Sequence, residues 1–311
     1  MQKCIAITGA TSMLGLSLID EAVDNQTEVI AIIRKNSKRK RLLPENPLIS
    51  VIECNLDEMS LKEILPNKSC DTFYHFSWEG TENAKRDHVI NHVNNIMYTI
   101  DALNLAKRMG AKRFIGAGSQ AEYGLVQHQI NVNTNAAPVT AYGVSKYSSG
   151  RLCSILADQI GIEFIWTRIF STYGIYDSAS TMLTYVIDEL LNRRKPILTQ
   201  CEQMWDYLNC RDAARAFYLL GLYGRNQGIY NIGSGIARPL LEYVTIIRNL
   251  IDKQLPLGIG EKEYAPKQIM YLCADISNLT ADTGFQPRIS FERGARETIQ
   301  WRQQIHREKE A

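Results

Sequence analysis

Two side chains four residues apart, Tyr142 and Lys146, carry the most informative chemistry in this sequence. On a helix, this spacing places both side chains on one face. A phenol with an ordinary pKa of about 10 is a poor base at neutral pH, but a nearby ammonium favours the phenolate and lowers that pKa. The pair can then exchange a proton with a hydroxyl or ketone group. The same spacing also arises by chance in exposed helices, so the surrounding residues decide its meaning.

A serine at the end of an expected strand supplies a third polar group. The apolar run 114–117 predicts a buried strand, and Ser119 follows it at the carboxyl end. From there its hydroxyl would hydrogen-bond a reacting oxygen and orient the substrate for hydride transfer with a nicotinamide. Ser119, Tyr142 and Lys146 are therefore the predicted catalytic residues.

A glycine-containing loop joins the first expected strand to the first expected helix. Gly9 permits the tight turn and Gly15 lets the helix approach the sheet, while amides at the helix N-terminus would hold a pyrophosphate. Ser12 stands where a middle glycine is expected, so either the loop lies further from the phosphates or the hydroxyl contacts one. A plain strand-to-helix connection is the alternative. The predicted cofactor contacts here are Gly9, Thr11, Ser12, Met13, Leu14 and Gly15.

A basic residue ends the second expected strand, at a place where an NAD site would carry an acid about twenty residues beyond the loop. Arg34 occupies it, and Ser37 with Lys38 or Arg39 lies close by in the sequence. These residues would bind an adenosine 2′-phosphate. NADP is therefore the favoured cofactor, with NAD as the alternative. A solvated basic turn is the other interpretation of this run.

The order of apolar segments predicts an α/β fold with a Rossmann-type doubly wound parallel sheet. Their β-branched and aromatic residues favour strands at 4–7, 29–33, 49–52, 72–76, 114–117 and 164–169. Helical patterns lie between several strands, at about 14–25, 88–109 and 141–160, and continue later at about 181–192, 212–223 and 240–251. We expect a dinucleotide-binding domain over 1–170, joined by parts of 206–235. A smaller substrate-binding lid domain would comprise mainly 171–311.

The composition is that of an ordinary globular protein, with 45% hydrophobic and 22% charged residues in a chain of 311. A net charge of +2 is too small to indicate a nucleic-acid partner. No segment is long and apolar enough for a signal h-region or a membrane span. The seven cysteines are scattered without CxxC spacing, so reduced thiols, no metal site and a cytoplasmic location are expected.

With these motifs in order, the chain resembles the extended short-chain dehydrogenase/reductase family, in its NDP-sugar epimerase/dehydratase/reductase branch. The resemblance runs essentially end to end. Its motifs are the 8–15 loop, 74–78 with Asn95, Ser119 with 123–124, the Tyr142 and Lys146 pair, 168–174, 205–207 with Asp212, 230–233, and 275–277 with 284–287.

The resemblance implies roles that the patterns alone do not assign. Tyr142 would be the catalytic acid/base, and Lys146 would also bind the nicotinamide ribose. Asn55 stands where the family usually has Asp near the adenine. His75 is expected to be structural or to line the cofactor, and the helix of Tyr142 with its neighbour would form a homodimer. The further cofactor contacts would be Asn55, Leu56, Phe76, Ser77, Trp78 and Asn95.

The two residues after Ser119 bear on the reaction. Family dehydratases carry an Asp-Glu pair there, whereas this chain has Gln120 and Ala121. Neither is a general acid or base, so 4,6-dehydration is not expected, and Glu122 would need a shifted loop. Because Arg34 favours NADPH, the predicted reaction is reduction of an NDP-4-keto-6-deoxyhexose. An NDP-sugar 4-epimerase with retained NAD is the first alternative, and a non-catalytic dinucleotide-sensing protein is the second.

The nucleotide sugar is expected to contact the second half of the chain and the residue after Ser119. Trp205 stands where many epimerases have an arginine for the diphosphate, and it is either a stacking residue or a core tryptophan. Asp212 is expected to cap the helix that it begins. The predicted substrate contacts are Gln120, Tyr173, Thr181, Met182, Leu183 and Trp205.

Overall fold

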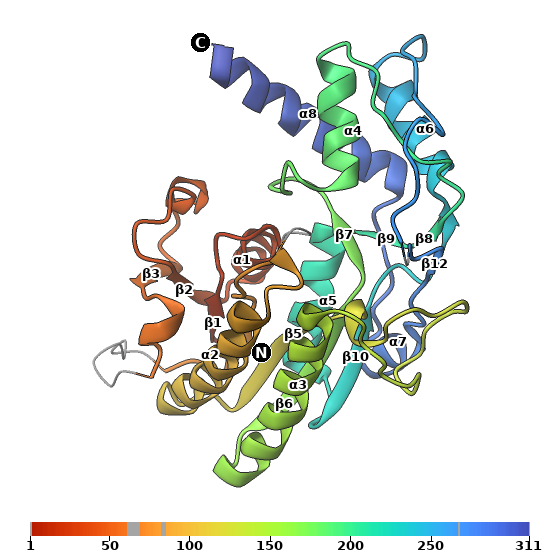
Figure 1. Ribbon diagram of the computed structural model, residues 1–311. Coiled ribbons are helices and arrows are strands. Elements are labelled where there is room, and N and C mark those ends of the chain that lie inside the picture. Colours follow the sequence, from red (N-terminus) through yellow and green to blue (C-terminus); the bar gives the residue numbers. More distant parts are fainter. Residues whose placement is uncertain (1, 61–68, 82–84, 267, 311) are drawn as a thin grey trace.

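A seven-stranded parallel sheet is the largest element of the computed structural model, which describes residues 2–60, 69–81, 85–266 and 268–310 (Figure 1). Its strands in spatial order are β10 (Gly228–Ile232), β6 (Glu163–Ile169), β5 (Arg113–Ser119), β4 (Thr72–His75), β1 (Cys4–Thr8), β2 (Glu28–Ile33) and β3 (Ile49–Glu53). The first six in the chain lie where the apolar runs predict them. The edge strand β10 comes from the second half of the chain, within 206–235.

Each face of this sheet has its own apolar core, because successive side chains of a strand point to opposite faces. Ile5 and Ile7 of β1 face one core, which is covered by α1 (Met13–Asp24), α5 (Cys210–Tyr223) and α7 (Ser277–Thr283). Ala6 faces the other core, which is covered by α2 (Val89–Arg108) and α3 (Ala141–Ile160). The doubly wound Rossmann-type fold predicted from the sequence is therefore confirmed.

A second group of helices packs beyond the carboxyl edge of the sheet (Figure 1). It consists of α4 (Met182–Leu191), α6 (Leu240–Ile251) and α8 (Phe291–Glu310), which share an apolar core with Tyr173 and Phe291. Short strands connect the two groups: β7 (Ser171–Tyr173) pairs with β9 (Tyr207–Asn209), and β8 (Met204–Trp205) lies between β11 (Arg238–Pro239) and β12 (Tyr271–Leu272). Among the described residues, no helix is both long and apolar enough to cross a bilayer.

The start of α5 differs from its prediction. The helix begins at Cys210, and Asn209 is its cap, because the Asn209 side chain accepts the Arg211 N–H at 3.0 Å. Asp212 lies in the first turn instead of capping the helix. Its carboxylate accepts the backbone N–H groups of Arg288 and Ile289 at 2.9 and 2.8 Å. Asp212 therefore ties α5 to the segment that leads into α8.

Candidate active site

A cleft of about 1150 Å³ opens at the carboxyl edge of the main sheet, lined by residues of the sheet and of the second group of helices. Folds of this type bind ligands at that edge. The part of the cleft nearest the sheet contains the end of β5, the start of α1 and the start of α3. The sequence-predicted site residues that line it are Ser12, Met13, Leu14, Phe76, Trp78, Ser119, Gln120, Tyr142, Lys146, Thr181, Met182 and Trp205.

Ser119, Tyr142 and Lys146 meet on one wall of this cleft. Ser119 ends β5 and caps the short 3-10 turn Gln120–Glu122, and its Oγ accepts the Ala121 N–H at 3.2 Å. Tyr142 and Lys146 lie in the first two turns of α3, which Thr140 caps by accepting the Gly143 N–H. Ser119 and Tyr142 line the same cleft, and interaction with the Ser119 side chain acts to lower the pKa of Tyr142. Residues from a strand and from a helix thus form one polar cluster.

The ammonium of Lys146 is buried against a carbonyl and an aromatic ring. Its Nζ donates to the Ala117 carbonyl oxygen at 2.6 Å and lies 3.6 Å from the centre of the Trp78 ring. Burial lowers the pKa of Lys146 to about 7, and the negative charge of Glu122 opposes this shift. Lys146 therefore exchanges its proton near neutral pH.

The phenol of Tyr142 has a raised pKa, because burial disfavours its charged form. Interaction with the Ser119 side chain and the positive charge of Arg86 oppose this rise; the guanidinium carbon of Arg86 lies 5.0 Å from the Tyr142 ring centre. Lys146 Nζ is 5.9 Å from the same ring centre. The lowered phenol pKa predicted from the Tyr142 and Lys146 spacing is thus wrong for this structure, since burial outweighs nearby positive charge. Arg86 belongs to no motif, and sequence reasoning missed it.

His75, close to the site, is held as a neutral side chain. Its Nδ1 is 2.8 Å from the Thr8 Oγ1, and its ring stacks on Phe114. Burial lowers the pKa of His75 to about 3, so the ring carries no charge at neutral pH. It joins the ends of β1 and β4 and is not among the residues that line the cleft.

The glycine loop is as tight as the motif requires. Gly9 has a φ of +67°, and a Cβ there would lie 2.9 Å from the Ser77 backbone nitrogen. A Cβ on Gly15 would lie 2.4 Å from the Gly9 carbonyl oxygen. Ser12 uses its hydroxyl to cap α1 by accepting the Gly15 N–H at 3.0 Å. A tight turn that presents a helix N-terminus to the cleft fits the pyrophosphate of a dinucleotide.

The basic run after β2 divides into exposed and engaged side chains. Arg34 and Lys38 are exposed, and Ser37 is half-buried. Arg39 donates to the carbonyl oxygens of Thr11 and Tyr176, at 2.8 and 2.9 Å, so its guanidinium joins the glycine loop to the segment after β7. Arg34 therefore faces solvent at the end of β2, as Lys38 and Arg41 do further along the run.

Two predicted cofactor residues hold backbone segments at the rim of the site. Asn55 accepts the Lys35 N–H at 3.1 Å and caps the 3-10 turn Leu56–Glu58, while Leu56 packs on the core under α2. Asn95 is buried, and its amide both donates to and accepts from the Glu79 backbone at 2.9 Å. These two amides shape the chain around the cleft and do not line it.

The predicted substrate residues separate into two groups. Gln120, Thr181, Met182 and Trp205 line the cleft, and the Trp205 Nε1 donates to the Ser171 Oγ at 2.7 Å while its ring packs at the edge of the core. Tyr173 and Leu183 are each 3% exposed and belong to the core of the second helix group. They are packed behind the cleft wall, because β7 and α4 turn these positions toward that core.

Two buried acceptors in the cleft have no hydrogen-bond partner within the described part of the chain. They are the Oε1 atoms of Gln120 and Gln203. Buried polar atoms are normally paired, so such acceptors are suited to the hydroxyl or N–H groups of a ligand. Gln203 was missed by sequence reasoning, because the motif that was matched begins two residues later at Trp205.

Known proteins resemble this chain over nearly its whole length. dTDP-glucose 4,6-dehydratase of Haemophilus influenzae is 24% identical, over 96% of this chain and 97% of the relative. The structure of UDP-N-acetylglucosamine 4-epimerase from Methanobrevibacter ruminantium, in complex with UDP-N-acetylmuramic acid, matches with a TM-score of 0.88 at 23% identity, covering 97% of this chain and 99% of that one.

UDP-glucuronic acid 4-epimerase from Bacillus cereus, in complex with UDP-glucuronic acid and NAD, matches with a TM-score of 0.84 at 21% identity, covering 97% of this chain and 99% of that one. These structural similarities show the shared fold. The model of the NAD dependent epimerase/dehydratase family matches residues 5–233, a span that includes the glycine loop, Ser119, Tyr142 and Lys146. The chain therefore belongs to the NAD dependent epimerase/dehydratase family.

Proposed function

We propose that this enzyme reduces an NDP-4-keto-6-deoxyhexose with NADPH. The observation that carries the proposal is the meeting of Ser119, Tyr142 and Lys146 on one wall of a cleft that also contains the glycine loop. A nucleotide sugar as substrate is supported by similar proteins, whose solved structures contain UDP-N-acetylmuramic acid or UDP-glucuronic acid.

The surroundings of Ser119 argue against dehydration. Gln120 and Ala121 have no acid or base chemistry at neutral pH, and Glu122 is 0% exposed. The Glu122 carboxylate is engaged by Arg168 and Trp166 and is not part of the cleft lining. The turn therefore brings no carboxylate into the cleft to remove water from a sugar.

The protonation state of Tyr142 suits a reductive reaction. Bound NADPH would supply the hydride that is added to C4 of the ketosugar. Tyr142, whose pKa is raised by burial, would hold its proton at neutral pH and donate it to the C4 oxygen, so that the ketone becomes a hydroxyl. Ser119 would orient that oxygen, and Lys146 would stabilise the phenolate left behind.

Arg34 supports NADPH over NADH as the reductant. Arg34 is exposed at the end of β2, at the position where an NAD site carries a carboxylate that would repel the 2′-phosphate. Ser37 lies in the turn that follows. Arg39 is engaged by two backbone carbonyls, whereas the exposed guanidinium of Arg34 is suited to a charge-assisted contact.

A 4-epimerase with retained NAD is the second candidate. It is favoured by the family match and by the solved structures of similar shape, several of which are 4-epimerases. An epimerase would oxidise and reduce the same C4 centre with the same three side chains. The two candidates differ in net cofactor consumption.

The first prediction concerns turnover. Purified protein is incubated with NADPH or NADH and with 4-keto-6-deoxyhexoses linked to CDP, dTDP, UDP or GDP, while absorbance at the nicotinamide wavelength is followed. We expect loss of NADPH with at least one ketosugar. Tyr142→Phe should lower kcat about 100-fold or more, because the proton donor is lost, with little change in NADPH affinity.

The matched control is Tyr223→Phe, at an exposed tyrosine of α5 outside the cleft lining. It should retain kcat. Interconversion of C4 epimers without net NADPH loss would overturn the reductase in favour of the epimerase. Cofactor binding with no conversion of any sugar nucleotide would instead support a non-catalytic dinucleotide sensor.

The second prediction concerns the cofactor. Arg34→Ala should raise the Kd of NADPH by about tenfold or more and leave that of NADH nearly unchanged, because a charge-assisted contact to the 2′-phosphate is lost. Fluorescence titration of both dinucleotides measures this. Lys40→Ala is the control, since Lys40 is basic but pairs with Glu53. Equal weakening of NADPH and NADH in Arg34→Ala would contradict an NADP-specific role.

The third prediction follows from the buried ammonium of Lys146. Its pKa in the fold, about 7, lies below the ordinary value of 10.5, so the unfolded chain holds more protons between these values. Stability contributed by this group therefore rises with pH across that window. Relative to Lys146→Met, the wild-type free energy of unfolding should increase by about 1 kcal/mol per pH unit between pH 7 and 9. Urea unfolding at stepped pH measures it; parallel curves would refute the buried, titrating lysine.

The fourth prediction concerns assembly. We propose that α2 and α3, which pack side by side, pair with those of a second copy. Together they expose an unusual set of large apolar side chains, 46 to 65% exposed, namely Val89, Ile90, Val93, Met97, Val144, Leu152 and Ile155.

Sedimentation velocity should give the mass of two chains. Met97→Glu with Ile155→Glu should give one chain, and Tyr223→Glu, at an exposed aromatic on α5, should leave the dimer intact. A monomeric wild type would exclude this pairing.

A further inference from the structure

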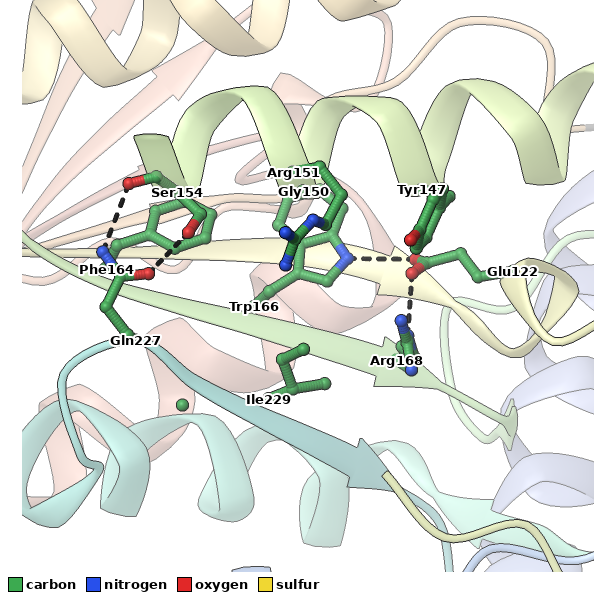
Figure 2. A pocket seen from close by; sticks show the side chains of 11 residues that line it. Glu122, Tyr147, Gly150, Arg151, Ser154, Phe164, Trp166, Arg168, Gln227 and Ile229 are labelled. Carbon is green, nitrogen blue, oxygen red and sulfur yellow. Dashed lines mark hydrogen bonds and ion pairs between the residues drawn. The ribbon is translucent and has the colours of Figure 1, made fainter. Parts of the chain in front are cut away.

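Glu122 is fully buried three residues after Ser119, and its carboxylate accepts three hydrogen bonds. Oε1 accepts the Ser119 backbone N–H at 2.9 Å and the Trp166 Nε1–H at 3.0 Å, and Oε2 accepts the Arg168 Nε–H at 2.8 Å. Figure 2 shows the Trp166 and Arg168 bonds converging on this carboxylate from β6. The carboxylate thus connects β6 to the backbone of a residue at the cleft.

The ion pair with Arg168 keeps Glu122 in place. A buried carboxylate is costly unless it is paired and hydrogen-bonded, and here all the required partners are present. The Arg168 side chain is 5% exposed, and its guanidinium carbon lies 4.4 Å from the Tyr123 ring centre. The Tyr123 ring therefore covers one side of this ion pair.

Trp166 sits between the sheet and the helix that carries Tyr142 and Lys146. A Cβ on Gly116 of β5 would lie 2.4 Å from the Trp166 ring, and one on Gly150 of α3 would lie 2.7 Å from it. A Cβ on Gly118 would lie 2.3 Å from the Glu122 Oε1. The three glycines thus leave room for the indole and for the carboxylate that it contacts. The indole lies between α3 and β5 and sets the distance between them.

The cluster lies outside the cleft itself. Glu122, Trp166 and Arg168 border a small separate cavity, which Arg151 and Gln227 also line (Figure 2). None of the three belongs to the cleft lining. Any effect of the cluster on the reaction must therefore pass through Ser119 and α3, without contact to the substrate.

We propose that Glu122 is a positioning residue, anchored by Arg168 and Trp166, which holds the Ser119 backbone so that the Ser119 hydroxyl stays aligned with Tyr142. The inference rests on the proposed function for its catalytic consequence. The reciprocal capping contacts of Ser119 and Glu122 link the hydroxyl and the carboxylate in one turn. A misplacement of about 1 Å at a reacting group costs about 100-fold in rate.

The deciding variant is Glu122→Met combined with Arg168→Met, which removes both charges and leaves no unpaired ion in the core. We expect a cooperatively folded protein whose backbone amides at 118–124 exchange with deuterium about tenfold faster than in the wild type, measured by mass spectrometry. We also expect kcat to fall about 100-fold, with KM and the Kd of NADPH nearly unchanged. Thr27→Val, which removes a buried hydrogen bond to Tyr218, is the control for general destabilisation and should alter neither readout.

Glu122→Gln separates charge from contact. Its amide oxygen still accepts the Ser119 N–H, so a partial rescue of kcat relative to the double variant is expected. The charge of Glu122 raises the pKa of both Tyr142 and Lys146, so its removal should move the alkaline limb of the kcat profile to lower pH.

A merely structural ion pair predicts a different pattern. Arg168→Met alone would then be unstable, while the double variant would recover wild-type stability, exchange and kcat, and this result would overturn the proposal. If the wild type turns over no sugar nucleotide, the proposed function has failed. The exchange measurement then decides this inference by itself, since unchanged exchange at 118–124 overturns it.

Discussion

The parallel alignment of the main sheet is the constraint on which the site depends. Thr8 is in register with His75, His75 with Gly116, and Ser119 with Ile169. The carboxyl ends of parallel strands lie at the same edge of a sheet. The glycine loop after β1, Phe76 after β4 and Ser119 at the end of β5 therefore meet there. Segments that are far apart in the sequence form one wall of the cleft without long loops.

The ion pairs of this structure differ in burial, and the pair of Glu122 and Arg168, with side chains 0% and 5% exposed, lies next to Ser119. Exposed pairs such as Lys35 with Glu58 and Lys40 with Glu53 contribute little to stability, because water and salt screen their charges. Breaking the buried pair of Glu122 and Arg168 from one side costs about 3–5 kcal/mol, whereas a well-packed apolar replacement is often neutral. Stability alone therefore does not account for a buried ion pair at this position. Its contact with Ser119 gives it a function in the site.

Six strands of the main sheet and the helices α1 to α6 could be predicted because their patterns are local. Short β-branched runs and helical periodicity identify β1 to β6 and α1 to α6 with boundaries close to those observed. The long helix α8 was not predicted, because it is rich in Arg, Glu and Gln with few apolar positions. The two-residue strands β8, β11 and β12 form only through tertiary pairing, which no local pattern reveals.

The site residues also divide into those that local patterns identified and those whose positions depend on tertiary packing. Tyr142, Lys146 and Ser119 were identified by spacing and by position after a strand, and the structure brings them together. Tyr173 and Leu183 were expected at the substrate, but which face of β7 and α4 points inward depends on packing against α6 and α8. The Ser-x-x-Glu pattern at 119–122 is a capping-box signature, a local signal from which the contact between Glu122 and the Ser119 backbone could have been predicted.

Arg39 shows why the cofactor and substrate sides of the cleft form one unit. Its guanidinium bridges the carbonyls of Thr11, in the glycine loop, and Tyr176, whose φ of +67° is unusual for a residue with a side chain. The next residue, Asp177, lines the cleft and accepts a hydrogen bond from the Thr181 hydroxyl at 3.0 Å. A strained backbone position persists only where its surroundings hold it. Arg39 helps to hold Tyr176 in this conformation, and Arg39 is itself bound to Thr11 of the glycine loop. The segment of Tyr176 and Asp177 therefore depends on the position of the glycine loop.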